Sequence, residues 1–288
     1  MTVLFSPPTE PVDPGLLSRA LEVGGRLAND AAEVIAATAQ RGGRLDAGIG
    51  THPYDWVTDT YRTLERHTRR VLASEFPDIP LVGGAYSGAA DTPPARYRWV
   101  VDPVGGSANY VAGLPWYAFS LALLDASGPV VGVLSDPSRA EIYAAARGRG
   151  MRANGVPVRL SDQAAVPGCP VCTELTGDGG WPGLSIFLAR AAHGRRGVRV
   201  LGSAALAVAQ VALGHAVATV LDSYQEWDVA ASLALAVEAG AVVLDRHGRP
   251  SQLPKDGMLV AAPPVVDDVL EWWRCAQQAG RNGTSAQR

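Results

Sequence analysis

Two aspartates occupy sequence positions that suit acid/base or metal chemistry. Asp102 precedes a proline in a glycine-rich turn, and Asp228 stands at the start of a predicted helix. Carboxylate oxygens are the ligands that Mg²⁺ prefers, whereas two adjacent carboxylates without a metal share a proton. Each aspartate also has a structural interpretation, because Asx residues form turns and cap helix N-termini. The residues alone leave both interpretations open.

The elements expected before residue 160 are two helices and a largely antiparallel sheet. Apolar residues recur at helical intervals over 16–40, and Thr58 or Asp59 can cap a second helix over 59–75. Runs rich in β-forming residues follow, separated by Gly and Pro turns. These runs predict strands at 79–83, 97–101, 117–124, 129–135 and 141–145.

Strands and helices alternate after residue 160, which is typical of an α/β arrangement. The polar tail from Gly280 predicts disorder. No linker separates the two parts, so we expect an N-terminal α+β half (1–160) packed against a C-terminal α/β half (161–288). The second half is predicted to hold strands at 169–173, 198–201, 217–221, 241–244 and 258–261, and helices at 182–193, from 203, and at 228–239.

Composition excludes several classes of protein. The 288 residues are 47% apolar, which is enough for a large core, and the net charge of −3 offers no basic field for nucleic acid. The sequence shows neither a signal-like start nor an apolar run of membrane-spanning length. We therefore expect a cytoplasmic protein with a small-molecule substrate and no nucleic-acid or membrane partner.

Residues 99–115, WVVDPVGGSANYVAGLP, resemble the W-[IV]-[IV]-D-P-[IL]-D-G-T-x-N-[FY]-x-x-G-x-P motif of the inositol monophosphatase family. Three further segments resemble the family's motifs in the family's order. They are DWVTDTYRTLE at 55–65, GSAAL at 202–206 and EWDVAA at 226–231, the last followed by EAGA at 238–241.

The resemblance implies a fold and an assembly. The fold is the layered α-β-α-β-α sandwich of the inositol monophosphatase/fructose-1,6-bisphosphatase type, with the active site in the cleft between the two halves. It also implies Mg²⁺-dependent phosphatase chemistry and a homodimer.

This chain departs from the family at most of its metal ligands. Gly83-Gly84-Ala85 stands where the family has Gly-Glu-Glu, and Gly105 replaces the second Asp of the central motif. Tyr61 replaces a water-activating Asp, and Ser107 replaces the motif Thr. With Asp102 and Asp228 as the remaining carboxylates, we expect no metal cofactor, or at most one weakly held Mg²⁺.

The remaining residues favour a repurposed enzyme. In the family geometry the two aspartates face one cavity, so they could act as a metal-independent acid/base pair, with Tyr61 as a donor. We expect a cyclase, isomerase or lyase acting on a small metabolite in specialised biosynthesis. The alternatives are a non-catalytic pseudophosphatase that binds a polyol or a partner, and a residual Mg²⁺-dependent phosphatase. The substrate-binding candidates are Ser107, Asn109, His52, Tyr86, Ser203 and Glu226.

Overall fold

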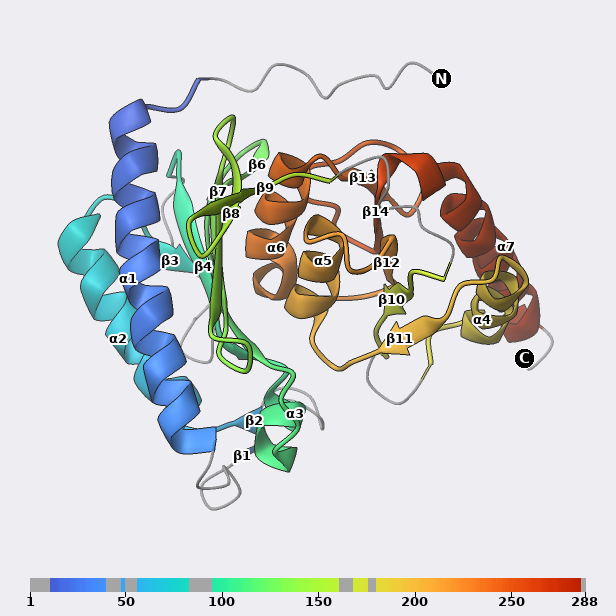
Figure 1. Cartoon of the computed structure of the whole chain (residues 1–288), viewed down its shortest axis with the longest axis horizontal. Helices are drawn as coiled ribbons and strands as arrows, with labels where there is room; N and C mark the ends of the chain where they lie inside the picture. Colours follow the sequence, from blue (N-terminus) through green and yellow to red (C-terminus); the bar gives the residue numbers. More distant parts are fainter. Residues whose placement is uncertain are drawn as a thin grey trace.

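The computed structural model describes residues 11–39, 48–49, 56–82, 95–160, 168–175 and 180–285. These residues form five layers (Figure 1): a helix pair, a seven-stranded sheet, a second helix pair, a five-stranded sheet and a third helix pair. The expected α-β-α-β-α sandwich is therefore confirmed. The division into halves at residue 160 stays a prediction.

The seven-stranded sheet is a nearly continuous meander. Its strands follow chain order, and every neighbouring pair is antiparallel except β3 and β4. The expected antiparallel sheet is confirmed, with two additional short strands after residue 149. The strands are β3 (Leu81–Val82), β4 (Arg98–Gly105), β5 (Ala118–Asp125), β6 (Gly128–Asp136), β7 (Glu141–Ala146), β8 (Gly150–Ala153) and β9 (Val156–Val158).

Helices α1 (Pro14–Ala39) and α2 (Asp59–Glu75) cover the outer face of this sheet (Figure 1). The Thr58 hydroxyl accepts a hydrogen bond from the Tyr61 N–H at 3.1 Å, which confirms Thr58 as the N-cap of α2. The sequence did not predict the short pair β1 (Gly48–Ile49) and β2 (Trp56–Val57), nor α3 (Ser107–Ala112), which follows β4.

Helices α5 (Ala204–Ala212) and α6 (Glu226–Ala239) form the central layer between the two sheets. Because apolar neighbours lie on both sides, α6 is buried almost all round and rich in alanine. Near its C-terminal end, the Glu238 carboxylate accepts hydrogen bonds from the N–H groups of Gly148 and Gly150 at 2.8 and 2.7 Å. This contact ties α6 to the β7–β8 turn.

The five-stranded sheet has the order β11-β10-β12-β14-β13. Strand β10 pairs in parallel with both β11 and β12, while β14 is antiparallel to both of its neighbours. The alternating α/β pattern expected after residue 160 is confirmed. The strands are β10 (Val171–Thr173), β11 (Val198–Val200), β12 (Ala218–Leu221), β13 (Val242–Asp245) and β14 (Met258–Ala261).

The outermost layer contains α4 (Leu184–His193) and α7 (Val266–Ser285), which follows the 3₁₀ turn η2 (Pro263–Val265). The sequence analysis missed α7, and the predicted disorder from Gly280 is wrong as far as Ser285. The reason is packing: Trp273 and Val269 are fully buried in the outer core cluster. Gly280 permits a close approach, because a Cβ there would lie 2.8 Å from the Pro182 backbone.

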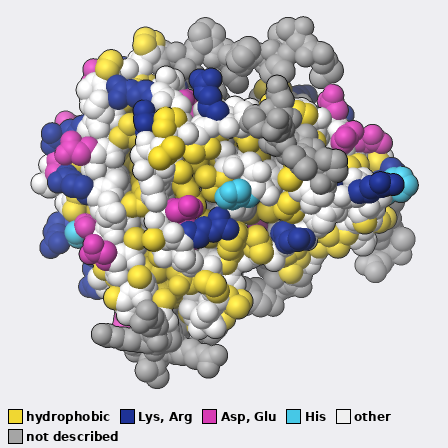
Figure 2. Space-filling view, viewed as in Figure 1, with side chains coloured by type: hydrophobic (Ala, Val, Ile, Leu, Met, Phe, Trp, Pro, Cys, Tyr) yellow, Lys and Arg dark blue, Asp and Glu magenta, His cyan; other side chains and the backbone are white. Residues whose placement is uncertain are grey.

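Figure 2 shows the outer surface in the view of Figure 1. On the described part of this face, basic side chains are interspersed with acidic and apolar ones. Among the residues that the structure describes, no helix has the length and apolarity needed to cross a membrane.

The contact between α6 and β6 gives a direct test of the central layer. A Cβ at Gly132 would lie 2.3 Å from the Ala231 carbonyl oxygen and 2.7 Å from the Ala234 Cβ. We expect Gly132→Ala to lower the free energy of unfolding by about 1–3 kcal/mol or more, because α6 must move off the sheet.

The control is Gly25→Ala on α1, where a new Cβ would meet nothing within 4 Å. That change should stabilise the protein by about 0.5–1 kcal/mol, because alanine is the better helix former. Urea unfolding measures both variants, and equal effects would contradict the packing described here.

Candidate functional site

Asp102 lies near the end of β4 with a relative exposure of 7%. Its Oδ1 accepts a hydrogen bond from the Val104 N–H at 3.2 Å, which is the Asx-type contact that the turn interpretation predicted. The β4–β5 register shifts between Asp102 and Gly105, and Asp102 itself is opposite Ser120. The Asp102 carboxylate is therefore held at an irregular end of a buried strand.

The Asp102 carboxylate occupies the space where a side chain at Gly105 would begin. A Cβ at this position would lie 2.7 Å from the Asp102 Oδ2. The Asp102 carboxylate thus lies against the position where the family's second aspartate would begin.

Asp228 is the third residue of α6, and its Oδ2 accepts a hydrogen bond from the Gln225 N–H at 2.7 Å. Gln225 and Asp228 form a reciprocal capping box, so the prediction of Asp228 as the N-cap itself is wrong by three positions. The Ser120 hydroxyl donates to the Trp227 carbonyl at 3.5 Å. Since Ser120 is opposite Asp102 in the β4–β5 pair, this contact joins the start of α6 to the part of the sheet that holds Asp102.

Two of the candidate binding residues connect the segments around Asp102 by hydrogen bonds. The Ser203 hydroxyl donates to the Gly105 carbonyl at 3.3 Å and caps α5. The Asn109 amide donates to the carbonyls of Trp116 and Leu201 at 2.9 and 2.7 Å. These contacts connect β4 and α3 with the turn before α5, while Ser107, 8% exposed, begins α3.

The other candidates have different surroundings. The Tyr61 side chain is 7% exposed and belongs to the apolar cluster between the α1–α2 pair and the seven-stranded sheet. Glu226 forms a two-bond ion pair with Arg98 at the opposite end of β4. His52 and Tyr86 lie outside the described residues, as do Gly83-Gly84-Ala85.

Glu174, which the sequence analysis missed, holds the same turn before α5 that Asn109 contacts. Its carboxylate accepts hydrogen bonds from the N–H groups of Leu201 and Gly202 at 3.3 and 2.7 Å. Burial raises the pKa of Glu174 to about 7, although these backbone hydrogen bonds oppose the rise. The signal in the sequence was a charged residue directly after a buried strand, at the carboxyl end of parallel β10, where α/β folds place ligands.

The raised pKa of Glu174 predicts a pH-dependent stability. Between its ordinary pKa of 4.5 and about 7, the folded state retains a proton that the unfolded chain has released. Stability from this group is therefore complete below pH 4.5 and is lost as the pH rises to about 7, by at most ~3 kcal/mol.

Urea unfolding at about pH 5 and about pH 8 measures most of this loss, because most of the interval from pH 4.5 to about 7 lies between these two values. We expect a smaller loss in Glu174→Gln than in the wild type, and an unchanged loss in the exposed control Glu271→Gln. An identical pH dependence in Glu174→Gln and the wild type would contradict the assignment.

Comparison with known proteins identifies the class of this fold and site. The model of the inositol monophosphatase family matches residues 17–278. The "Nus factor SuhB" of Pasteurella multocida is 30% identical over 257 residues, covering 87% of this chain and 94% of that protein. The inositol-1-monophosphatase of Mycobacterium bovis is 34% identical over 240 residues, covering 76% of this chain and 78% of the relative.

The solved structure of Thermotoga maritima IMPase superposes with a TM-score of 0.79 at 26% identity, covering 90% of this chain and 98% of that one. The layered sandwich is thus that of the inositol monophosphatase fold. The chain belongs to the inositol monophosphatase family.

These comparisons correct two expectations. A non-phosphatase acid/base enzyme is wrong, because the relatives include proteins named inositol monophosphatase. The expectation of no cofactor is also wrong for a member of this family. A structural neighbour with a TM-score of 0.76 and 19% identity is an IMPase/NADP phosphatase complexed with NADP and Ca²⁺.

Two further expectations concern partners, and the comparisons confirm neither of them. The Pasteurella multocida relative is named a Nus factor, so the comparisons give no support to the exclusion of nucleic acid. The homodimer stays a prediction.

Proposed function

We propose that this chain is a divalent-metal-dependent phosphomonoesterase of low activity, acting on a small sugar or inositol phosphate. The observation that carries the proposal is the junction of β4, β5 and α6. There Ser120 is opposite Asp102 and contacts the residue before Asp228. Family membership and the relatives named inositol monophosphatase support the phosphatase class.

The donor set of the junction fits one Mg²⁺. This ion is commonly held by one or two carboxylates, with waters and substrate phosphate oxygens completing its shell, and Asp102 and Asp228 supply two. When bound, Mg²⁺ would neutralise phosphate charge and orient the attacking water. Within the described ranges, no group of three or more His, Cys, Asp or Glu side chains suits a metal. We therefore propose weak binding.

The chain's own groups orient these carboxylates. The Val104 N–H fixes one oxygen of Asp102, and the Gln225 N–H fixes one oxygen of Asp228. Hydrogen bonds to charged acceptors are stronger than those between neutral groups, so each carboxylate is held in one orientation. The Asn109 and Ser203 contacts fix the adjacent wall, which limits the movement of a bound phosphate ester.

A phosphate-release assay on myo-inositol 1-phosphate tests the proposal. We expect slow release that requires Mg²⁺ and stops with a chelator. Asp102→Asn and Asp228→Asn should each lower the rate at least about tenfold, because each removes a charged ligand. The control Asp78→Asn, on an exposed turn, should retain the wild-type rate. Chelator-resistant release, or full activity in both aspartate variants, would contradict the proposal.

A second candidate is a pseudophosphatase that binds a phosphorylated polyol without turnover. The specific observation is Gly105, where Asp102 Oδ2 lies against the place of the missing ligand. Calorimetry with the same phosphate ester separates the two candidates. Saturable binding without phosphate release at any Mg²⁺ concentration would establish the second candidate over the first.

A further inference from the structure

A groove of about 580 Å³ lies between helices α1 and α2. These helices pack against each other on the face of the seven-stranded sheet that is opposite to α6 (Figure 1). The groove is therefore separated by this sheet from the helix that carries Asp228. Its volume is within the size range of small-molecule sites. The lining residues are Asp30, Glu33, Val34, Thr63, Leu64, Arg66, His67 and Arg70.

The groove has an apolar floor. Leu64 is 2% exposed and belongs to the apolar cluster beneath α1 and α2, and Val34 packs against the same cluster. The exposed Thr63 adds a hydroxyl beside this floor. Such a floor favours a ligand with an alkyl part, because contact removes apolar surface from water.

The two walls of the groove carry opposite charges. Helix α1 supplies the exposed carboxylates of Asp30 and Glu33, whereas α2 supplies the exposed guanidinium groups of Arg66 and Arg70. Residues three or four positions apart share one face of a helix, so each pair belongs to one wall. A purely anionic or purely cationic ligand would meet charge of its own sign on one of the walls, which disfavours both kinds.

His67 connects the two walls. Its Nε2 lies 2.8 Å from the Asp30 Oδ2, and its Nδ1 lies 3.4 Å from a terminal nitrogen of Arg70. Because a guanidinium can only donate, Nδ1 of His67 accepts, and Nε2 carries the proton that is donated to Asp30. This chain of contacts holds the two helices' side chains in place before a ligand arrives, which lowers the cost of ordering them around it.

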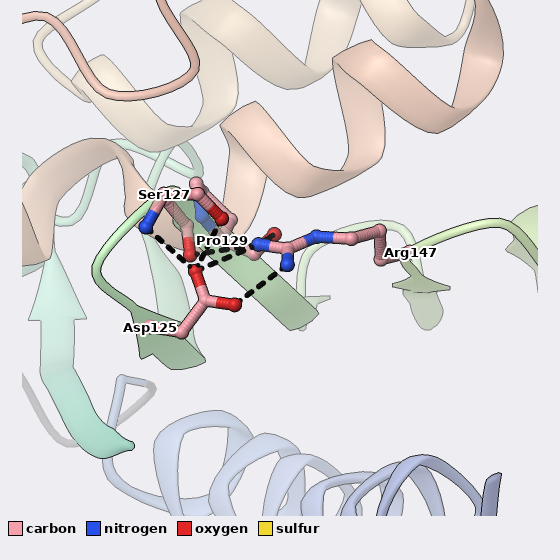
Figure 3. Close-up of polar contacts among 5 residues, drawn as sticks. Asp125, Ser127, Pro129 and Arg147 are labelled. Carbon is pink, nitrogen blue, oxygen red and sulfur yellow. Dashed lines mark hydrogen bonds and ion pairs between the residues drawn. The ribbon is translucent and has the colours of Figure 1, made fainter. Parts of the chain in front are cut away.

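Arg66 and Arg70 lack the carboxylate partner that several arginines of this chain have. Figure 3 shows such a pair at the β5–β6 turn, where Arg147 donates to both oxygens of Asp125 at 2.6 and 3.0 Å. Within the described ranges neither groove arginine forms an ion pair, and Glu33 forms none there either. The charges of these three side chains are therefore available to a ligand.

We propose that the α1–α2 groove binds a small ω-amino acid, which carries a carboxylate and an ammonium at opposite ends of an alkyl chain. Arg66 and Arg70 hold the carboxylate, whose planar geometry a guanidinium matches. Glu33 holds the ammonium, and Val34 and Leu64 contact the alkyl chain. The ligand's two charges must be well separated, because the axes of packed helices are about 8–10 Å apart. The site does not depend on the proposed phosphatase activity.

Calorimetric titration of 6-aminohexanoate into the whole chain tests the site, at low ionic strength because salt screens exposed charges. We expect weak, saturable binding. Hexanoate lacks the ammonium and hexylamine lacks the carboxylate, so each should bind about fivefold more weakly, the upper value for one exposed ion pair. Equal binding of either analogue, or no saturable binding of 6-aminohexanoate at millimolar concentration, would overturn the proposal.

Three variants test the two walls separately. Arg66→Ala, Arg70→Ala and Glu33→Gln should each weaken the binding of 6-aminohexanoate about three- to fivefold. The matched controls are Arg152→Ala on β8 and Glu271→Gln on α7, both exposed, and they should bind as the wild type does. Unchanged binding in all three groove variants would overturn the proposal.

The analogues add a readout that a merely structural role would not change. Arg66→Ala should weaken the binding of hexanoate but not that of hexylamine, which has no carboxylate to contact the arginine. The variant Asp102→Asn/Asp228→Asn should bind 6-aminohexanoate as the wild type does, whatever the result of the phosphate-release assay. Binding that is lost in that variant but retained in the groove variants would contradict the assignment. Thermal melting confirms that every variant is folded.

Discussion

Helix α6 packs against both sheets at once, and the rest of the molecule depends on this constraint. Its buried residues are mainly alanine, with Leu233 and Leu235 as the largest side chains, and they pack toward β6 on one side and toward the five-stranded sheet on the other. Gly132 completes the fit by allowing the Ala231 carbonyl to lie close to β6. Since interiors are packed at the density of organic crystals, the position of α6 has little freedom.

The fixed position of α6 decides where its first turn lies. Its first turn places Asp228 near the part of β4 and β5 that holds Asp102, and it places Glu226 against Arg98. Asp102 and Arg98 are four residues apart along β4. The two carboxylates of this turn therefore have different partners.

The fold was predictable where local patterns and motifs agree with packing. The β-rich runs after residue 97 predicted the meander, and the motif around Asp102 predicted the layered sandwich. Helix α7 was not predicted, because its polar tail around Gly280 resembles a disordered end until Trp273 is seen in the core. Asp102 and Asp228 are candidates from their motif positions, whereas Glu174 was missed, since its contacts are to N–H groups some 27 residues away in sequence. The non-phosphatase enzyme expected from the missing ligands was also wrong, because relatives of this chain are named inositol monophosphatase.

The central claim is that Asp102 and Asp228 together form one divalent-metal site. Calorimetric titration of Mg²⁺ into the chelator-treated protein tests it most directly, with the Asp102→Asn/Asp228→Asn variant as the comparison. The account predicts one weak, saturable site per chain in the wild type and none in the variant. An absence of Mg²⁺ binding in the wild type, or equal binding in both proteins, would contradict it.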